Sequence, residues 1–490
     1  MDRLLAKARR FSTCSTAVRL TFDKYFLAGF ETLTKATAPS AFYDYGHQFD
    51  VPRCHENTRV AVLEKIGEWV DLVIEITAFI MWLYGAAGAG KSAIARTMAE
   101  KLHSRQKLLA TFFFSRQDSS RNHINSVIAT LTYKIALTVP EARPLIVATI
   151  ENDPLIFHSG FAHQLQQLII EPLHQLSQQG GIYPTVIIID GLDECLDHDE
   201  RTILLHSISG AAGQDSAPLK FLITSRPEVP IARVFNTTPV VEVSARHSLD
   251  DEPESMEDVE YFLSAKFDEI KRTHPSRRHI SDDWPSSQVK ADLVQRSSGQ
   301  FIYPATIIRY ISSPRHSPTL RLDTILKLRA LSGESPFAQL DALYRYILLS
   351  CEDVELALRI IGTCLLLTQN IEPPWGGTYN IPWEMMAPEC MEPVLRLDPG
   401  DVQRGVEDLG SLVEYKGDDN QLRVLHASLF DFLSDPTRFS GLPFDLAAIH
   451  TDLAVWCSYL DAGHDDFQIR GLKCESDILY RLFLSWKRAP

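Results

Sequence analysis

The run from Gly85 to Ser92, which reads Gly-Ala-Ala-Gly-Ala-Gly-Lys-Ser, constrains the fold of this chain more than any other feature of its sequence. It comes directly after the apolar run Phe79 to Tyr84 and before a helical pattern with Ile94, Met98 and Leu102 on one face. A glycine-rich turn between a buried strand and a helix presents successive backbone N–H groups that bind phosphate. The spacing therefore predicts a phosphate-binding loop at the edge of an α/β sheet.

The residues of this loop have separate predicted roles. Its glycines permit a close approach of the backbone and positive φ angles. Lys91 is expected to bind the β- and γ-phosphates, and the Ser92 hydroxyl is expected to bind a Mg²⁺ ion that bridges them. The expected cofactors are therefore ATP or ADP together with Mg²⁺. The predicted nucleotide contacts within the loop are Gly85, Gly88, Ala89, Gly90, Lys91 and Ser92.

Short apolar runs separated by amphipathic segments fill residues 76–240. Continuous apolar runs of this length are typical of buried parallel strands joined by crossover helices. This region is therefore predicted to be an α/β domain. The runs are residues 79–84, 109–114, 185–189 and 220–224.

The chain on either side of this region is predicted to be mostly helical. A helix is expected to begin at Thr58, whose hydroxyl would cap it, and residues 37–40 have the composition of a linker. An acidic stretch at residues 250–257, which contains Pro253, marks a domain boundary. Beyond it, apolar periodicity predicts helices at residues 258–271, 288–297, 305–311, 340–350 and 354–367.

Charged residues follow two of the apolar runs at the point where each run ends. One run ends in Asp190, which is the expected partner of Mg²⁺, and Asp193 and Glu194 follow it. Glu194 is the favoured base for the attacking water, with Asp193 as the alternative. Arg226 follows the run at residues 221–224 and is placed to sense the γ-phosphate, although a solvent-facing arginine is the simpler alternative.

Composition limits the class of protein and of partner. A length of 490 residues corresponds to about three or four domains. The formal net charge of -15 opposes binding to a phosphate backbone, so nucleic acid is not expected to be the main ligand. The 8 cysteines include no CxxC pair, as in reduced cytoplasmic proteins. The most apolar stretch, residues 76–90, is shorter than the roughly 20 residues of a membrane-spanning helix.

Two segments carry a family resemblance. The sequence Asp190-Gly191-Leu192-Asp193-Glu194 resembles the Walker B segment of NACHT proteins, a class of STAND P-loop NTPases. The stretch from Pro52 to Arg59 resembles the segment that precedes the phosphate loop in fungal NACHT proteins of the nephrocystin-like N-terminal type. The resemblance implies that the backbone of Thr58 and Arg59 lies near adenine, with a plain helix cap as the alternative.

Two later segments extend this resemblance. Residues 299–305 are similar to the entry of the lid helix that packs on the nucleotide in this family. Residues 425–433 are similar to the His-x-Ser motif of the winged-helix domain, whose histidine contacts the β-phosphate of ADP in the closed state. This similarity implies a nucleotide contact for His426; a purely structural histidine is the alternative.

The resemblance also implies an architecture, in which a parallel sheet of order 5-1-4-3-2 is followed by a helical lid and a winged helix. The expected divisions are a basic helical leader at 1–40, a linker and entry helix at 41–75, the NACHT nucleotide-binding domain at 76–240, the lid at 250–340, the winged helix at 341–445 and a helical segment at 446–490.

The function implied is an ATP/ADP-dependent conformational switch that hydrolyses ATP slowly. Self-association on ATP binding and an unidentified protein trigger are the expected partners besides the nucleotide. Two alternatives stay open: a nucleotide-binding scaffold without hydrolysis, and a P-loop phosphotransferase that acts on a second substrate. The scaffold would tolerate replacement of Asp193 and Glu194, and the phosphotransferase would need an acceptor pocket.

Overall fold

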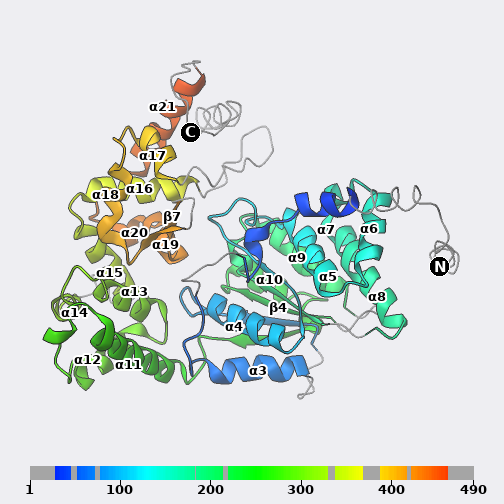
Figure 1. Cartoon of the computed structure of the whole chain (residues 1–490), viewed down its shortest axis with the longest axis horizontal. Coiled ribbons are helices and arrows are strands. Elements are labelled where there is room, and N and C mark those ends of the chain that lie inside the picture. The colour runs from blue at the N-terminus through cyan, green and yellow to red at the C-terminus, as the bar shows by residue number, and fades with distance from the viewer. Residues whose placement is uncertain are drawn as a thin grey trace.

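The computed structural model describes residues 28–45, 52–71, 78–181, 184–212, 219–328, 337–367, 387–416 and 421–461. Figure 1 shows two parts side by side, a sheet flanked by helices and a mostly helical part. We call residues 28–248 the α/β unit and residues 255–461 the helical half.

A single parallel sheet forms the centre of the α/β unit. Its strand order is β2-β3-β4-β1-β5, and every neighbouring pair is parallel. Read from the other edge, this is the predicted order 5-1-4-3-2, which is thereby confirmed. The strands are β1 (Ile80–Tyr84), β2 (Leu108–Phe113), β3 (Val186–Asp190), β4 (Lys220–Ser225) and β5 (Ser244–Ser248).

Alternate residues of each central strand enter two separate cores. In β3, Ile187 and Ile189 pack with the helices on one face, whereas Val186 and Ile188 pack with those on the other. Successive side chains of a strand point to opposite faces, so a continuous apolar run can fill both. The helices of this unit are α3 (Val60–Asp71), α4 (Lys91–Ser104), α5 (Val127–Thr138), α6 (Arg143–Asn152), α7 (Phe161–Leu165), α8 (Glu171–Gln178), α9 (His198–Gly210) and α10 (Val229–Phe235).

The edge strand β5 has no apolar run and was not among the four runs recognised in the sequence. It reads Ser-Ala-Arg-His-Ser and pairs only with β1. Of its side chains, only His247 is buried. A strand at the edge of a sheet is covered on fewer sides, so it does not need the continuous apolar pattern of a central strand.

Two expectations about the N-terminal region are wrong. Helix α3 begins at Val60, and the Thr58 hydroxyl donates to the carbonyl of His55 at 2.7 Å instead of capping the helix. The predicted linker at residues 37–40 is packed, because Ala38 is buried in the core of the α/β unit and its N–H donates to Thr130 Oγ1 at 2.9 Å. Residues 1–27 of the predicted leader lie outside the described residues, as do residues 462–490.

The helical half contains the five helices predicted there, each observed within a few residues of its expected bounds. One apolar core runs through it from α11 to α19. Its elements are α11 (Ser255–Thr273), α12 (Ser287–Ser297), α13 (Ile302–Ile311), α14 (Pro318–Leu326), α15 (Ala338–Leu349), α16 (Val354–Leu367), α17 (Pro388–Leu395), α18 (Asp401–Val406), the antiparallel pair β6 (Val413–Lys416) and β7 (Gln421–Val424), α19 (Ala427–Ser434), α20 (Pro436–Phe439) and α21 (Leu446–Asp461).

Candidate nucleotide-binding site

The loop from Gly85 to Ser92, called the phosphate loop below, joins β1 to α4. Gly88 has φ +80° and Gly90 has φ +93°, which is the left-handed region where glycine is strongly favoured. Gly90 is the residue that precedes the first turn of α4. The first N–H groups of this 14-residue helix have no partner within the helix, so the loop and the helix start can together bind an anion.

Gly88 is also a point of close contact with the helical half. The Ile302 N–H, at the start of α13, donates to the Gly88 carbonyl at 3.3 Å. A Cβ atom added to Gly88 would lie only 2.1 Å from Ile302 Cγ2. The segment at residues 299–305 therefore lies directly on the phosphate loop.

Lys91 is held against the loop that it follows. Its Nζ donates to the carbonyls of Gly85 and Ala86, both at 2.8 Å. Burial lowers the pKa of Lys91, and the carboxylate of Asp193 counters that effect. An ammonium group has three N–H donors, so one remains for a phosphate oxygen.

Asp250, two residues after β5, also holds the phosphate loop. Its carboxylate oxygens accept the Ala86 N–H at 3.0 and 3.1 Å. Gly85 makes this approach possible, because a Cβ there would lie 3.0 Å from Leu249 Cβ. The end of the edge strand thus holds the first turn of the phosphate loop.

Asp190, at the end of β3, lies among hydroxyl groups. Thr224 Oγ1 donates to Asp190 Oδ1 at 2.5 Å and accepts the Gly191 N–H at 3.0 Å. Burial raises the pKa of Asp190, and hydrogen bonds from Thr224 and Ser92 act in the opposite direction. The structure therefore brings together the two residues predicted to bind Mg²⁺.

Asp193 and Glu194 differ sharply in their contacts, although they are neighbours in a short 3-10 helix, η6 (Leu192–Glu194). Asp193 Oδ1 accepts the Arg226 N–H at 3.0 Å, and its Oδ2 lies 3.1 Å from Arg226 Nε. Both oxygens of this carboxylate are therefore taken up by one arginine, and Asp193 fixes the side chain that follows β4.

Among the described residues, the one hydrogen bond to the Glu194 carboxylate is longer: its Oε2 accepts the Arg116 N–H at 3.2 Å. Burial, together with the negative charge of the neighbouring Asp193, raises the pKa of Glu194 to about 7. A carboxylate with a pKa near neutrality can accept a proton at physiological pH, which is the property of a general base.

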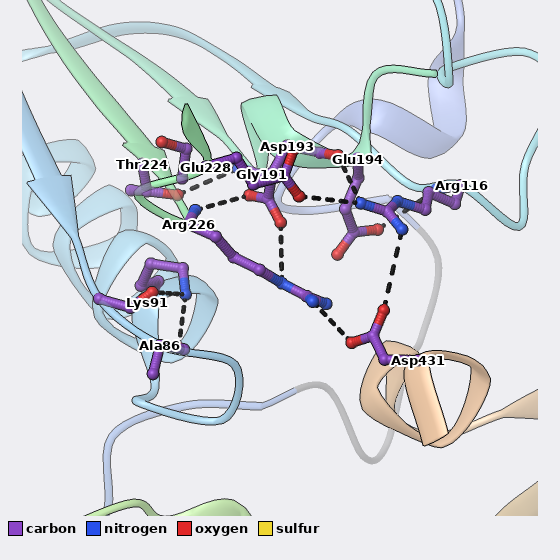
Figure 2. A network of polar contacts seen from close by, with 12 residues as sticks. Ala86, Lys91, Arg116, Gly191, Asp193, Glu194, Thr224, Arg226, Glu228 and Asp431 are labelled. Atoms are coloured by element: carbon purple, nitrogen blue, oxygen red, sulfur yellow. Dashed lines mark hydrogen bonds and ion pairs between the residues drawn. The ribbon is translucent and has the colours of Figure 1, made fainter. Parts of the chain in front are cut away.

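Arg226 reaches beyond the α/β unit. Its Nη1 lies 2.6 Å from Oδ2 of Asp431, a residue of α19 in the helical half. Arg116, three residues after β2, approaches the same carboxylate, with Nη1 at 3.9 Å from Asp431 Oδ1. Figure 2 shows the two arginines converging on Asp431 from opposite sides. The simpler expectation of a solvent-facing Arg226 is wrong, because its side chain is only 19% exposed.

Arg59, just before α3, connects the entry segment to both the loop and the helical half. Its Nη2 donates to the Ala89 carbonyl at 3.0 Å, and its guanidinium lies 5.1 Å from the ring centroid of Phe301. Its N–H donates to Asp258 at 2.9 Å. Thr58 lies next to it and is buried. The predicted adenine-side residues are therefore close to the phosphate loop.

His426 lies immediately before α19. Burial, together with the positive charges of Arg309 and Arg423, lowers the pKa of His426 to about 4. Within the part of the chain that the structure describes, no hydrogen bond joins His426 to the phosphate loop. Its predicted nucleotide contact stays a prediction.

Sequence reasoning missed several polar residues around the site. Arg116 follows the apolar run at residues 109–114, as Arg226 follows the run at residues 220–224. A search for charged residues at the end of every apolar run would therefore have found it. Thr224 and Asp250 also lie at strand ends, but their residue types carry no specific signal. Asp431 lies 205 residues from Arg226 in the chain, so only the fold brings them together.

Neither a protein-only metal site nor a membrane-spanning helix is found in the described ranges. No group of at least 3 His, Cys, Asp or Glu side chains there is arranged to hold a metal ion. No helix there has the length and hydrophobicity that crossing a bilayer requires. Mg²⁺ bound with a nucleotide usually takes only one or two protein ligands, which the pair Ser92 and Asp190 can supply.

Solved structures show weak overall similarity to this chain. One is the structure of Drosophila ORC bound to poly(dA/dT) DNA and Cdc6, with 10% identity over 97% of this chain and 74% of the other, and a TM-score of 0.25. Another is Drosophila ORC bound to AT-rich DNA and Cdc6, with 11% identity over 96% and 75% and a TM-score of 0.27. At these TM-scores, nothing about the ligand of this chain follows.

No curated protein matches the chain in sequence. A family model does match the part of the chain that carries the site. The matched residues, 64–226, include the phosphate loop, Asp190, Glu194 and, as the last position, Arg226. This span is similar to the family described as Nephrocystin 3, N-terminal.

Proposed function

We propose that this chain is an ATP/ADP-dependent conformational switch of the NACHT class that binds Mg-ATP at the phosphate loop and hydrolyses it slowly. The observation that carries the proposal is the convergence of three kinds of group at one edge of a parallel sheet. These are the loop with Lys91, the carboxylates that follow β3 and the arginine that follows β4. Phosphoryl-transfer sites need a phosphate cradle, a metal-binding hydroxyl–carboxylate pair and a cation for the γ-phosphate.

Each residue at this edge has a distinct task in the proposal. The N–H groups of the loop bind the phosphates, and Lys91 neutralises their charge. Ser92 and Asp190 would hold Mg²⁺, which would supply positive charge to the phosphate oxygens. Glu194 takes the proton of the attacking water, since Asp193 is occupied by Arg226. Arg226 contacts the γ-phosphate, and Arg59 with Thr58 forms the adenine side.

The helical half supplies the moving part in this proposal. Residues 250–340 act as the lid, which is supported by the contact of Ile302 with Gly88. Residues 341–445 act as the winged helix, which is supported by the β6–β7 hairpin that leads into α19. We further propose a cytoplasmic location, a protein trigger and self-association on ATP binding. That nucleic acid is not the main ligand stays a prediction from net charge.

The nucleotide that the purified protein retains tests this function. Denaturing the protein and identifying the released nucleotide by chromatography should yield ADP, and added Mg-ATP should be hydrolysed slowly. Tight binding with no phosphate release would favour the non-hydrolysing scaffold. A protein that neither retains nor binds ADP or ATP would contradict the proposal.

A further inference from the structure

A carboxylate of the helical half occupies the place where two arginines of the α/β unit meet. Asp431 Oδ2 lies 2.6 Å from Arg226 Nη1, and Asp431 Oδ1 lies 3.9 Å from Arg116 Nη1. Each arginine follows a different strand, and both strands end at the edge that carries the phosphate loop. We call Arg116 and Arg226 the arginine pair. In this structure the arginine pair contacts the carboxylate of Asp431 (Figure 2).

Each arginine is also anchored within the α/β unit. Arg226 Nε lies 3.1 Å from Asp193 Oδ2, and Arg116 Nη2 donates to the Asp193 carbonyl at 2.8 Å. Arg116 Nη2 also lies 3.4 Å from Glu228. These anchors fix the guanidinium groups without any help from Asp431. Asp431 can therefore leave while the arginine pair keeps its position.

The ion pairs of Asp431 with the arginine pair are partly shielded from water, so they contribute to the stability of the contact between α19 and the α/β unit. The side chains of Arg226, Asp431 and Arg116 are 19%, 24% and 28% exposed. Burial alone lowers the pKa of Arg226, but Asp431 and Asp193 outweigh that effect and raise it. A charge-assisted hydrogen bond of 2.6 Å is at the strong end of such contacts. Removing Asp431 thus leaves Nη1 of Arg226, a partly buried donor, without its carboxylate partner, and this end of the guanidinium group then attracts another anion.

We infer that Asp431 and the terminal phosphate of a nucleoside triphosphate compete for the arginine pair, so that the seam between α19 and the α/β unit stays closed until a triphosphate displaces Asp431. This inference rests on the proposed function, because it assumes that nucleotide binds at the phosphate loop. A γ-phosphate bound to Arg226 would lie beside the Asp431 carboxylate, and these two negative charges would repel each other. ADP has no such group and leaves Asp431 in place.

Hydrogen bonds connect α19 and its neighbour β7 to other elements, so displacement of Asp431 affects more than one contact. Tyr344 Oη and Ser428 Oγ share a hydrogen bond of 2.9 Å, which ties α19 to α15. Gln117, next to Arg116, donates to the Val424 carbonyl of β7 at 3.1 Å. Loss of the Asp431 contact therefore weakens a seam that β7 and α19 form together.

Binding of labelled nucleotides to the full chain tests this inference. Mant-ATPγS and mant-ADP are titrated in the presence of Mg²⁺ against wild type and Asp431→Asn. The variant should bind ATPγS about tenfold more tightly than wild type and ADP within about twofold of wild type, as expected for a coupling free energy of ordinary size. Asp341→Asn is the matched control, since this carboxylate binds Arg438 within the helical half and is similarly shielded. It should leave the ratio of the two affinities unchanged.

The outcomes separate this inference from the proposed function. If wild type binds both nucleotides and Asp431→Asn has the same affinity ratio, the competition is refuted and the nucleotide site stands. If wild type binds neither, both are refuted. Hydrogen exchange of wild type gives a second test that needs no variant. Mg-ATPγS should speed amide exchange in residues 427–434 relative to ADP, and equal exchange in both would also overturn the inference.

Discussion

At the scale of single residues, two adjacent acids perform different tasks because their surroundings differ. Asp193 is bound by the backbone and side chain of Arg226, so its charge is neutralised locally. The Glu194 carboxylate accepts a hydrogen bond from the Arg116 N–H, and burial raises its pKa to about 7. The sequence offered both as the base, and only the contacts separate them.

Glu194→Gln should therefore bind ATP as wild type does but hydrolyse it roughly 100-fold more slowly, as is usual when a general base is removed. In wild type, the hydrolysis rate should rise with pH up to about 7, because only the deprotonated carboxylate accepts a proton. Phosphate release in single-turnover experiments measures both effects. Asp199→Asn, at an exposed acid of α9, is the control. A variant that hydrolyses at the wild-type rate would exclude Glu194.

His426 should make the fold sensitive to mild acid. Its folded-state pKa is lowered to about 4, while an unfolded histidine keeps a pKa near 6.5. The unfolded chain therefore binds more protons in this window, so stability falls as pH drops from about 6.5 to about 4. From about pH 7 to about pH 4.5, wild type should lose about 2–3 kcal/mol more than His426→Leu. Urea unfolding at both pH values checks this, and equal losses would contradict it.

The same variant separates the two roles considered for His426. A contact with the β-phosphate predicts that His426→Leu releases ADP faster than wild type. A purely structural histidine predicts equal losses of thermal stability with and without ADP, together with unchanged release. Stopped-flow release of mant-ADP distinguishes them, and unchanged release would remove His426 from the nucleotide contacts.

At the scale of elements, the phosphate loop and α13 are fitted to each other. Gly88 and Gly90 both have positive φ, so alanine at either position incurs backbone strain. Only Gly88 lacks space, since an added Cβ would meet Ile302, whereas nothing lies within 4 Å at Gly90. Gly88→Ala should therefore cost about 1–3 kcal/mol more than Gly90→Ala. Thermal unfolding without nucleotide measures the difference; equal losses would show that the contact with Ile302 carries no energy.

The central strands could be predicted from the sequence, but the edge strand could not. A strand covered on both faces must be apolar throughout, so β1 to β4 stand out as runs. Strand β5 contains Arg246 and His247 and resembles a loop in composition. The wrong prediction of a helix cap at Thr58 has a different cause. A threonine hydroxyl that can cap a helix can equally bond to the preceding turn, and here it donates to the His55 carbonyl.

At the scale of the whole molecule, the contacts between the α/β unit and the helical half involve residues that no local pattern links. Asp258 accepts the Arg59 N–H, and Asp431 binds Arg226, across long stretches of chain. The resemblance of residues 425–433 points to His426, which lies just before α19. The residue of this segment that contacts Arg226 is instead Asp431, within α19. Side-chain pairing of this kind depends on how two folded parts dock, which periodicity does not encode.

Opening of the seam should change the assembly state. When α19 leaves the arginine pair, surface of the α/β unit that Asp431 covers becomes available to another molecule. Mg-ATPγS should therefore raise the mass of the purified chain above that of the monomer, whereas ADP should not. Multi-angle light scattering after gel filtration measures both states. A monomeric mass in both, with nucleotide confirmed bound, would contradict self-association and favour the scaffold.

The most direct test of the central claim is equilibrium binding of labelled ATP to wild type and Lys91→Ala. Lys91 donates to two carbonyls of the phosphate loop and offers a third donor and a positive charge to the phosphates. Its loss should weaken ATP binding by about 100-fold or more, as expected for charged hydrogen bonds. Lys101→Ala, on the exposed last turn of the same helix, should bind ATP like wild type. Unchanged affinity in Lys91→Ala would show that the nucleotide does not bind at this loop.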